Sequence, residues 1–227
     1  MKLVVFDMAG TTVDERNVVY EVMTASLVAA GVEVELEAVV AVGAGQEKRS
    51  ALARILAAHE GQAPDAGRVD RIFRDFERRL DAAYEVLAVK GLPGAEAVFG
   101  ALRDAGVKVV LNTGYARRVA EGLIARLGWR VGAEIHGLVA ADDVGRSRPD
   151  PAMIQRAMAT FGVTDAREVA KVGDTVADIL EGRNAGCGLS IGVTTGAQTR
   201  EALAAAAPDA IVDRLVDILA LVGVVRH

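Results

Sequence analysis

The chain has 227 residues, of which 52 % are hydrophobic, and a net charge of −5. This length fits one large domain or a core with an inserted lobe, and the composition is ample for a buried core. The negative charge provides no basic surface for nucleic acid, and one cysteine, Cys187, excludes an intrachain disulfide. No apolar run suggests a signal peptide or a membrane span, so we expect a cytoplasmic protein with no nucleic-acid or membrane partner.

The first predicted element is a short buried strand at Leu3–Phe6, which ends in Asp7. Residues 15–91 follow and read as helices alone, with glycines between them. We therefore predict an all-helical cap domain at 15–91, inserted into a core formed by 1–14 and 92–227, with tethers at 12–16 and 90–94. The helices predicted in the insert are Val18–Ala30, Glu35–Val42, Gln46–His59 and Val69–Leu87.

After residue 92, apolar strand-like runs alternate with helical patterns. This alternation predicts an α/β fold with a parallel sheet and helices on both faces, in which ligands bind at the carboxyl ends of the strands. The predicted strands are Val107–Leu111, Glu168–Val172 and Leu189–Val193. The predicted helices are Ala95–Ala105, Arg117–Leu127, Ala152–Phe161, Thr175–Ala185 and Ala202–Pro208, before a strand and a helix within Ile211–Val224.

Polar side chains follow three of the predicted strands. Asp7, Thr113 and Asp174 each come after one, and the carboxyl ends of parallel strands meet at one edge of a sheet. Gly10 and Gly114 let backbone amides approach an anion there. Two carboxylates aimed at one spot repel each other unless a cation intervenes, and Mg²⁺ takes carboxylates together with phosphate oxygens. The sequence therefore predicts a Mg²⁺ and phosphate site at this edge.

Each of these segments alone also fits an ordinary α/β protein, in which an Asp after a strand is common and "GDTVAD" is a helix N-cap. Their combination resembles the haloacid dehalogenase superfamily: "DMAGTT" is similar to its first motif, "NTG" to its second and "GDTVAD" to its fourth. "GRSRPDP" is similar to the third motif, a Lys or Arg near a Pro, with Arg146 at the matching place. The resemblance covers Lys2 to about Ala197 and implies a Rossmann-like α/β core with a helical cap.

The resemblance also implies roles for the residues at the strand ends. Asp7 attacks phosphorus and forms an aspartyl-phosphate, while Thr113 and Arg146 hold the phosphoryl oxygens. Mg²⁺ is bound by Asp7, Asp174 and the backbone carbonyl of Ala9.

Further residues near these motifs complete the expected site. Asp178 lies one helical turn beyond Asp174 and is expected to brace that loop or the waters of the metal. The residues expected to contact the substrate are Gly10, Thr11, Gly114, Tyr115 and Arg117.

Ala9 departs from most phosphatases of the superfamily, which carry an acid/base Asp at that position. One branch does have "D-x-A-G-T", namely the phosphonoacetaldehyde hydrolases (phosphonatases) and their relatives. "TGYAR" is similar to the "TGY-x-R" of that branch, and "GQEK" places Lys48 where the branch has a cap lysine. Cleaving a carbon–phosphorus bond expels a carbanion, and a lysine imine accepts that electron pair. The resemblance thus implies a phosphonatase-like hydrolase with Asp7 and Lys48.

Other readings stay open at this point. Ala51 and Ala44 stand where the branch has a His and a Met, and Lys48 also fits a solvated turn at the start of a helix. A phosphate monoesterase resembling phosphoglycolate phosphatases is one alternative, and a non-catalytic binding protein on the same fold is another. In the enzymatic readings the partner is a small phosphate or phosphonate, and the protein is a monomer or homodimer.

Overall fold

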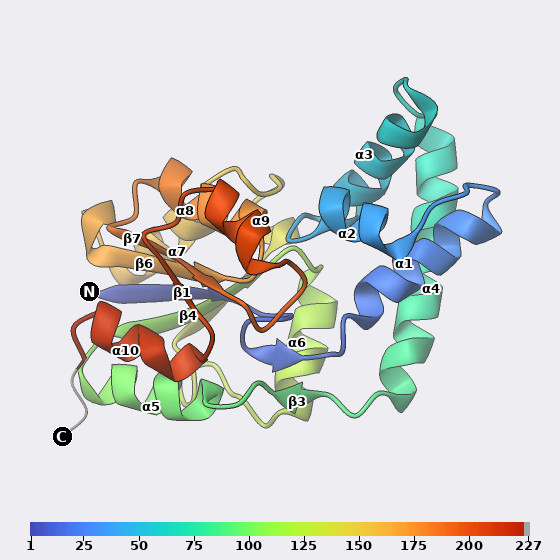
Figure 1. Cartoon of the computed structure of the whole chain (residues 1–227). Helices are drawn as coiled ribbons and strands as arrows, with labels where there is room; N and C mark the ends of the chain where they lie inside the picture. Colours follow the sequence, from blue (N-terminus) through green and yellow to red (C-terminus); the bar gives the residue numbers. More distant parts are fainter. Residues whose placement is uncertain (225–227) are drawn as a thin grey trace.

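A computed structural model describes residues 1–224 and is built around a six-stranded parallel sheet (Figure 1). The strand order is β5-β4-β1-β6-β7-β8, so β1 lies between two strands that come much later in the chain. Helices cover both faces, which explains why most strands read as continuous apolar runs. The strands are β1 Leu3–Asp7, β4 Lys108–Thr113, β5 Gly137–Ala140, β6 Val169–Gly173, β7 Leu189–Val193 and β8 Ala210–Val212.

Alternate residues of β1 enter two different apolar clusters. Val4 and Phe6 pack on the face covered by α5, α6 and α10, while Leu3 and Val5 pack on the face covered by α7. This period of two is what a strand buried on both sides requires. The helices of this layer arrangement are α5 Ala95–Asp104, α6 Arg117–Arg126, α7 Ala152–Phe161, α8 Val176–Ala185, α9 Arg200–Ala205 and α10 Ile218–Leu221.

Four further helices form a helical insert beside the carboxyl ends of the strands (Figure 1). They are α1 Val18–Ala29, α2 Leu36–Gly43, α3 Lys48–Glu60 and α4 Ala66–Val86. The chain enters and leaves the insert through two short antiparallel strands, β2 Val13–Asp14 and β3 Lys90–Gly91. The predicted α/β fold is confirmed, and the division into two domains stays a prediction.

Helix α4 shows why the insert is helical. Its buried residues Val69, Ile72, Phe76 and Leu80 recur every three or four positions, so they form one apolar stripe. The Asp65 side chain accepts a hydrogen bond from the Arg68 amide and caps the first turn. The stripe therefore supplies the apolar face on which the rest of the insert packs.

The observed elements differ from the predicted ones mainly at their ends. The strand Gly137–Ala140 was not predicted, because four residues after an irregular segment carry too little pattern to read. The last helix is also shorter than the region predicted for it, occupying Ile218–Leu221 after β8. Among residues 1–224, no helix combines the length and apolar character needed to cross a membrane.

The segment between α2 and α3 docks onto the sheet edge through backbone atoms. The Gly45 carbonyl accepts a hydrogen bond from Arg148, at 3.2 Å, and the Glu47 amide donates to Ser147 Oγ, at 3.0 Å. A Cβ at Gly114 would lie only 2.3 Å from the carbonyl oxygen of Gln46. The insert thus sits directly on the strand ends, and Gly114 is the residue that leaves room for it.

This contact predicts that Gly114→Ala weakens the docking of the insert. The added methyl group meets backbone atoms rather than the end of a flexible side chain, and we expect a loss of about 1–3 kcal/mol in the free energy of unfolding. Gly122→Ala in α6 is the control, because a Cβ there meets nothing within 4 Å. Urea unfolding of both variants is the measurement, and equal stability for the two would contradict the contact.

Candidate active site

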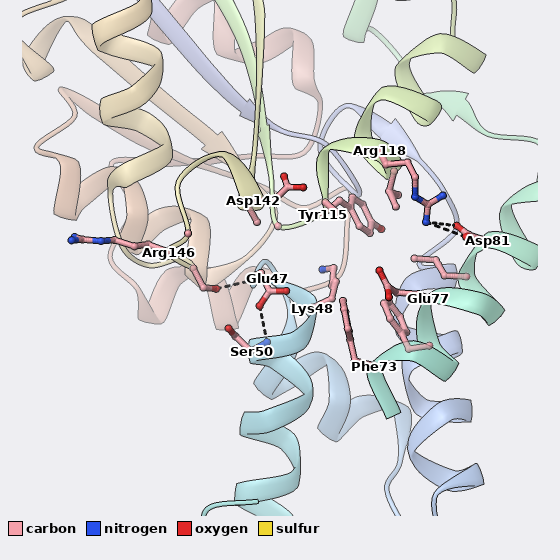
Figure 2. A pocket seen from close by; sticks show the side chains of 18 residues that line it. Glu47, Lys48, Ser50, Phe73, Glu77, Asp81, Tyr115, Arg118, Asp142 and Arg146 are labelled. Atoms are coloured by element: carbon pink, nitrogen blue, oxygen red, sulfur yellow. Dashed lines mark hydrogen bonds and ion pairs between the residues drawn. The ribbon is translucent and has the colours of Figure 1, made fainter. Parts of the chain in front are cut away.

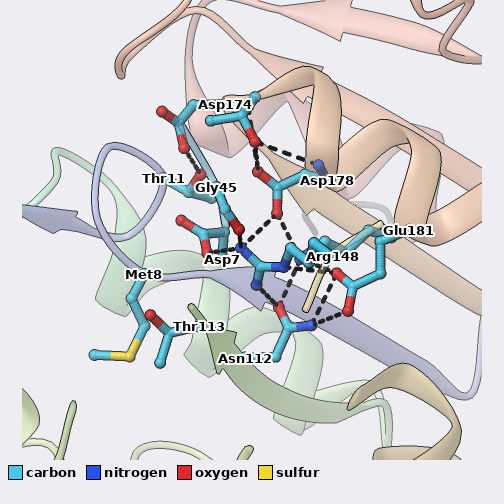
Figure 3. Close-up of polar contacts among 12 residues, drawn as sticks. Asp7, Met8, Thr11, Gly45, Asn112, Thr113, Arg148, Asp174, Asp178 and Glu181 are labelled. Atoms are coloured by element: carbon cyan, nitrogen blue, oxygen red, sulfur yellow. Dashed lines mark hydrogen bonds and ion pairs between the residues drawn. The ribbon is translucent and has the colours of Figure 1, made fainter. Parts of the chain in front are cut away.

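Asp7 lies in a buried polar cluster on the edge of the sheet (Figure 3). It ends β1, pairs in register with Asn112 of β4, and is flanked on the other side by β6, which runs into Asp174. Parallel strands bring these residues together although they are far apart in the chain. The strand order β4-β1-β6 therefore brings Thr113, Asp7 and Asp174 to one edge of the sheet, as expected.

Arg148 is the hub of this cluster. Its side chain is completely buried, and its guanidinium donates to Asp7 Oδ1 at 2.6 Å, to Asn112 Oδ1 at 2.7 Å and to Glu181 Oε2 at 2.9 Å. Burial alone would favour the neutral form, but the carboxylates of Asp178, Glu181 and Asp7 prevail and raise the pKa of Arg148. Arg148 is thus a permanent cation that holds one oxygen of Asp7 in a fixed position.

The expected role of Arg146 is corrected by this geometry. Its side chain is 69 % exposed, pairs with Asp150 at 3.4 Å and points away from Lys48 (Figure 2). Arg148, two residues later and directly before Pro149, occupies the place expected for it. The segment "GRSRPDP" offers two arginines near a proline, and an irregular loop has no periodicity that tells the buried one from the exposed one.

Three further buried polar residues were missed by sequence reasoning. Lys171 Nζ lies 2.9 Å from Asp178 Oδ1 and donates to Asn112 Oδ1 at 2.6 Å, while the Asn112 amide donates to Glu181. Lys171 and Asn112 stand inside the apolar strands β6 and β4. A lysine or an asparagine in the middle of a buried strand is rare unless it is paired. Their positions within apolar strands could therefore have indicated a buried polar cluster.

The carboxylates of the cluster outnumber its cations. Asp7, Asp174, Asp178 and Glu181 are buried with only two cationic side chains, those of Arg148 and Lys171. Burial, together with the charges of Asp7 and Asp178, raises the pKa of Asp174 to about 8. One carboxylate oxygen from each of the three aspartates lies within 4.8 Å of the others. This surplus of two acidic groups over the cationic side chains, all of them oxygen ligands, fits a divalent cation such as Mg²⁺.

The surroundings of Asp174 hold its carboxylate in place. Thr11 Oγ1 and the Ala197 amide donate to it at 2.9 and 2.7 Å. A Cβ at Gly10, where φ is +81°, would lie 2.5 Å from Asp174 Oδ2, so only glycine fits. Thr11 therefore positions Asp174 in this structure, and a contact of Thr11 or Gly10 with substrate stays a prediction.

Asp178 is engaged on both of its oxygens. One accepts hydrogen bonds from Thr175 in a capping box at the start of α8, and the other faces Arg148 at 3.1 Å and Lys171 at 2.9 Å. Burial opposes the effect, but these two cations lower the pKa of Asp178. Asp178 thus braces the loop after β6, as expected from its position.

Two other expected site residues lie in the neighbouring turns. Thr113 Oγ1 accepts from the Tyr115 amide at 3.2 Å, at the buried end of β4. Ala9 lies in the turn after β1, where it bridges Val13. Phosphoryl binding by Thr113 and metal binding by the Ala9 carbonyl stay predictions.

Arg117 is placed outside the cluster, contrary to expectation. Its guanidinium donates to Asp143 and to Glu121, and its Nη2 reaches the Leu138 carbonyl. These carboxylates raise the pKa of Arg117 well above its usual range, although burial opposes them. Arg117 thus links the start of α6 to β5 and to the turn after β5. Its positive charge is paired there with Asp143 and Glu121.

Lys48 reaches the site from the helical insert (Figure 2). It is the first residue of α3, it is 7 % exposed, and its Nζ lies 4.9 Å from the Tyr115 ring centroid and 5.5 Å from that of Tyr20. Burial lowers the pKa of Lys48, the Arg148 charge acts in the same direction, and Asp7 opposes both. The burial excludes the solvated turn that the sequence left open.

A cavity of about 280 Å³ lies between the insert and the sheet edge and opens beside Lys48. Tyr115 and Gly114 line it from the core, and α4 lines it with apolar side chains. Contact of Tyr115 and Gly114 with substrate stays a prediction. The residues that form its apolar wall are Phe73, Phe76, Leu80 and Val119. A small carbon-containing group in this cavity would lie against the Lys48 amine.

One more buried polar residue, Glu15, was missed because it lies in a tether. Glu15 is 1 % exposed, and its Oε2 accepts a hydrogen bond from the Tyr84 hydroxyl at 2.9 Å. The Tyr84 hydroxyl also lies 3.0 Å from the Tyr115 hydroxyl. Burial raises the pKa of Glu15 to about 7, although Tyr84 and the Lys48 charge oppose it. In sequence, "VDERN" carries no sign that its Glu is buried.

Comparison with known proteins identifies the family of this chain. The family model of the haloacid dehalogenase-like hydrolases matches residues 1–186. The chain belongs to this family. It is 36 % identical over 129 residues to a phosphonoacetaldehyde hydrolase of Parabacteroides distasonis, covering 56 % of this chain and 47 % of the relative. A Bacillus cereus phosphonoacetaldehyde hydrolase is 35 % identical over 138 residues, covering 60 % and 50 %. The chain therefore spans about half the length of these curated relatives.

Solved structures resemble this chain over almost its whole length. A hydrolase from Pseudomonas syringae superimposes with a TM-score of 0.85 at 19 % identity, covering 97 % of both chains. A phosphonoacetaldehyde hydrolase like protein from Oleispira antarctica gives a TM-score of 0.82 at 25 % identity, covering 97 % of this chain and 91 % of the other. The family model thus confirms the predicted membership of the superfamily, and these structures share its fold.

The hub position of Arg148 leads to a direct test against Arg146. Arg148→Met leaves the buried Asp7 carboxylate without its ion-pair partner and takes one cation from Asp178 and Glu181, so we expect a loss of about 3–5 kcal/mol in the free energy of unfolding. Arg146→Met removes an exposed pair and should change it by less than about 1 kcal/mol. Urea unfolding at pH 7 measures both, and a larger loss for Arg146→Met would overturn the assignment.

The charge excess predicts that Mg²⁺ stabilises the protein. A ligand that binds only the folded state contributes about 2.7 kcal/mol at one hundred times its Kd, so the melting temperature should rise on adding Mg²⁺ to protein in EDTA. Asp174→Asn should raise the melting temperature without metal, because it relieves repulsion, and should abolish most of the Mg²⁺ response. An unchanged Mg²⁺ response in this variant would place the metal elsewhere.

Proposed function

We propose that this hydrolase cleaves the carbon–phosphorus bond of phosphonoacetaldehyde or a related phosphono-aldehyde, with Asp7 as nucleophile and Lys48 as imine-forming amine. The observation that carries the proposal is the buried Lys48, held by the docked insert at the edge where Asp7 ends β1. The curated relatives named phosphonoacetaldehyde hydrolase support the same substrate class. Ala9 supports it too, because an alanine supplies no acid to an alkoxide leaving group.

The chemistry divides between the two sides of the site. The neutral Lys48 amine adds to the aldehyde carbon, and loss of water leaves an iminium ion. The carbon–phosphorus bond then breaks, its electron pair passes to the iminium as an enamine, and phosphorus bonds to a carboxylate oxygen of Asp7. Protonation of the enamine carbon and hydrolysis of the imine release the aldehyde, while a water molecule hydrolyses the aspartyl-phosphate.

The buried environment supplies what these steps need. Burial lowers the pKa of Lys48, which increases the neutral fraction that can attack a carbonyl. Arg148 holds Asp7 Oδ1, so Oδ2 is the oxygen that we assign to attack on phosphorus. Asp7 and Asp174 would hold Mg²⁺, which when bound offsets the repulsion between a phosphonate and the carboxylates.

Phosphate release by two variants, compared with the wild type, tests this function. Lys48→Arg keeps the charge but cannot form an imine, so release from phosphonoacetaldehyde should fall at least about 10³-fold. Lys90→Arg, an exposed lysine in β3, is the matched control and should match the wild type. The Mg²⁺-dependent rise in melting temperature should persist in Lys48→Arg, which shows that the Asp7 edge is intact.

Ala9→Asp separates this function from ester hydrolysis by a phosphate monoesterase. The new carboxyl group supplies a general acid for alkoxide leaving groups, so hydrolysis of esters such as phosphoglycolate should rise while phosphonate cleavage gains nothing. If the wild type hydrolyses phosphate esters faster than the phosphonate and Lys48→Arg leaves that rate unchanged, the proposal is wrong.

A further inference from the structure

The insert and the core together enclose a chain of three buried polar groups beside Lys48. Glu15 comes from the tether after β2, Tyr84 from the last turn of α4, and Tyr115 from the loop after β4. The Tyr84 hydroxyl lies 2.9 Å from Glu15 Oε2 and 3.0 Å from the Tyr115 hydroxyl. Tyr115 lines the cavity next to Lys48, so the chain connects a buried carboxyl group to the cavity wall.

This chain has two hydrogen-bond orientations, because each hydroxyl donates one hydrogen. When Glu15 is ionised, Tyr84 donates to Glu15 and Tyr115 donates to Tyr84. When Glu15 is protonated, its carboxyl group donates to Tyr84, Tyr84 donates to Tyr115, and the Tyr115 hydroxyl hydrogen is available to the cavity. Protonation of Glu15 therefore decides whether Tyr115 can donate to a molecule beside Lys48.

A purely structural role explains this arrangement poorly. Glu15 Oε1 is buried with no hydrogen-bond partner within residues 1–224, and an unpaired buried carboxyl oxygen is destabilising. The Lys48 charge is close enough to lower the pKa of Glu15, yet the two side chains form no ion pair in the described part of the chain. The arrangement keeps a protonatable group near the amine without locking the amine in a salt bridge.

We propose that Glu15, acting through Tyr84 and Tyr115, donates and takes back the protons of imine formation and hydrolysis at Lys48. This inference rests on the proposed function. It assigns Glu15 as a positioning and proton-storing residue, while Tyr115 is the group that meets the substrate. The phosphonatase branch has a histidine at the position of Ala51, and alanine cannot transfer a proton. The chain from Glu15 would supply the proton transfer that this histidine would otherwise provide.

The proton balance of the step is closed. The Lys48 nitrogen bonds to the aldehyde carbon, and the carbinolamine then loses its hydroxyl group as water. That hydroxyl takes a proton from Tyr115, which is replaced from Tyr84 and in turn from Glu15, leaving an iminium ion and the Glu15 carboxylate. Hydrolysis of the product imine runs the same transfers in reverse and restores the Glu15 proton.

The groups that face Glu15 come from four elements: Tyr20 of α1, Lys48 of α3, Tyr84 of α4 and Tyr115 after β4. Burial raises the pKa of all three tyrosines well above 10, so they stay protonated near neutral pH. Glu15, whose pKa burial raises to about 7, is thus the member of this set that titrates near neutrality, while burial lowers the pKa of Lys48.

Lys48 also faces the charges of Asp7, Arg148 and Glu47. A change at Glu15 alone leaves these three side chains in place. Glu15→Gln also removes a charge that raises the pKa of Lys48, so the rising limb of the profile should shift to lower pH. Loss of the falling limb is therefore the change that reports on Glu15 as a proton donor.

The test is the rate of imine formation at Lys48 as a function of pH. Protein is mixed with phosphonoacetaldehyde, quenched with borohydride at set times, and the adduct on Lys48 is quantified by mass spectrometry. In the wild type the rate should rise as Lys48 loses its proton and fall as Glu15 loses its own, near pH 7. In Glu15→Gln the fall should disappear and the maximal rate should drop about 10²-fold.

Two further variants keep the result interpretable. Tyr84→Phe interrupts the hydrogen-bonded chain and leaves Glu15 in place, so its pH profile should also lose the falling limb. The double variant Glu15→Gln/Tyr84→Phe should form the adduct no more slowly than the slower of the two single variants. Glu21→Gln, which removes an exposed carboxylate from α1, is the control and should match the wild type. Circular dichroism checks that each variant is folded.

The outcomes separate this inference from the proposed function. A wild type that forms no adduct on Lys48 overturns both. An adduct whose pH profile keeps its shape in Glu15→Gln and in Tyr84→Phe, even with a lower overall rate, overturns the proton chain and leaves the imine chemistry standing.

Discussion

The structure depends on one buried arginine that holds three carboxylates and a backbone carbonyl at the same time. Arg148 contacts Asp7 at the end of β1, Asp178 and Glu181 on α8, and the Gly45 carbonyl of the helical insert. A buried cation of this kind is tolerated only when its partners are complete. The position of Asp7, the loop after β6 and the position of the insert are therefore fixed by one side chain.

The same constraint explains why the insert belongs to the active site. Gly45 and Gln46 lie against the strand ends with so little space that Gly114 admits no side chain. Lys48 begins the helix that follows directly, so backbone contacts fix its place in the chain, and its amine packs against the rings of Tyr115 and Tyr20. Docking also completes the chain from Glu15 to Tyr115, because Tyr84 belongs to the insert and Tyr115 to the core.

How far the sequence predicts the molecule depends on whether a residue lies in a pattern. Asp7 and Asp174 were predictable, because each directly follows an apolar strand and parallel strands end at one edge. Arg148 was confused with Arg146, because both lie in an irregular loop where burial leaves no periodic trace. Glu15 was missed for a related reason, since its burial is produced by tyrosines from two distant segments.

The central claim is that Asp7 and Lys48 act on the same substrate molecule from opposite sides of the site. Borohydride reduction during turnover tests it most directly, with the wild type compared with Asp7→Asn. The account predicts an N-ethyl group on Lys48 in the wild type, after phosphorus has left, and an N-phosphonoethyl group on Lys48 in Asp7→Asn, where it cannot leave. Adducts confined to other lysines, or none in either protein, would contradict the account.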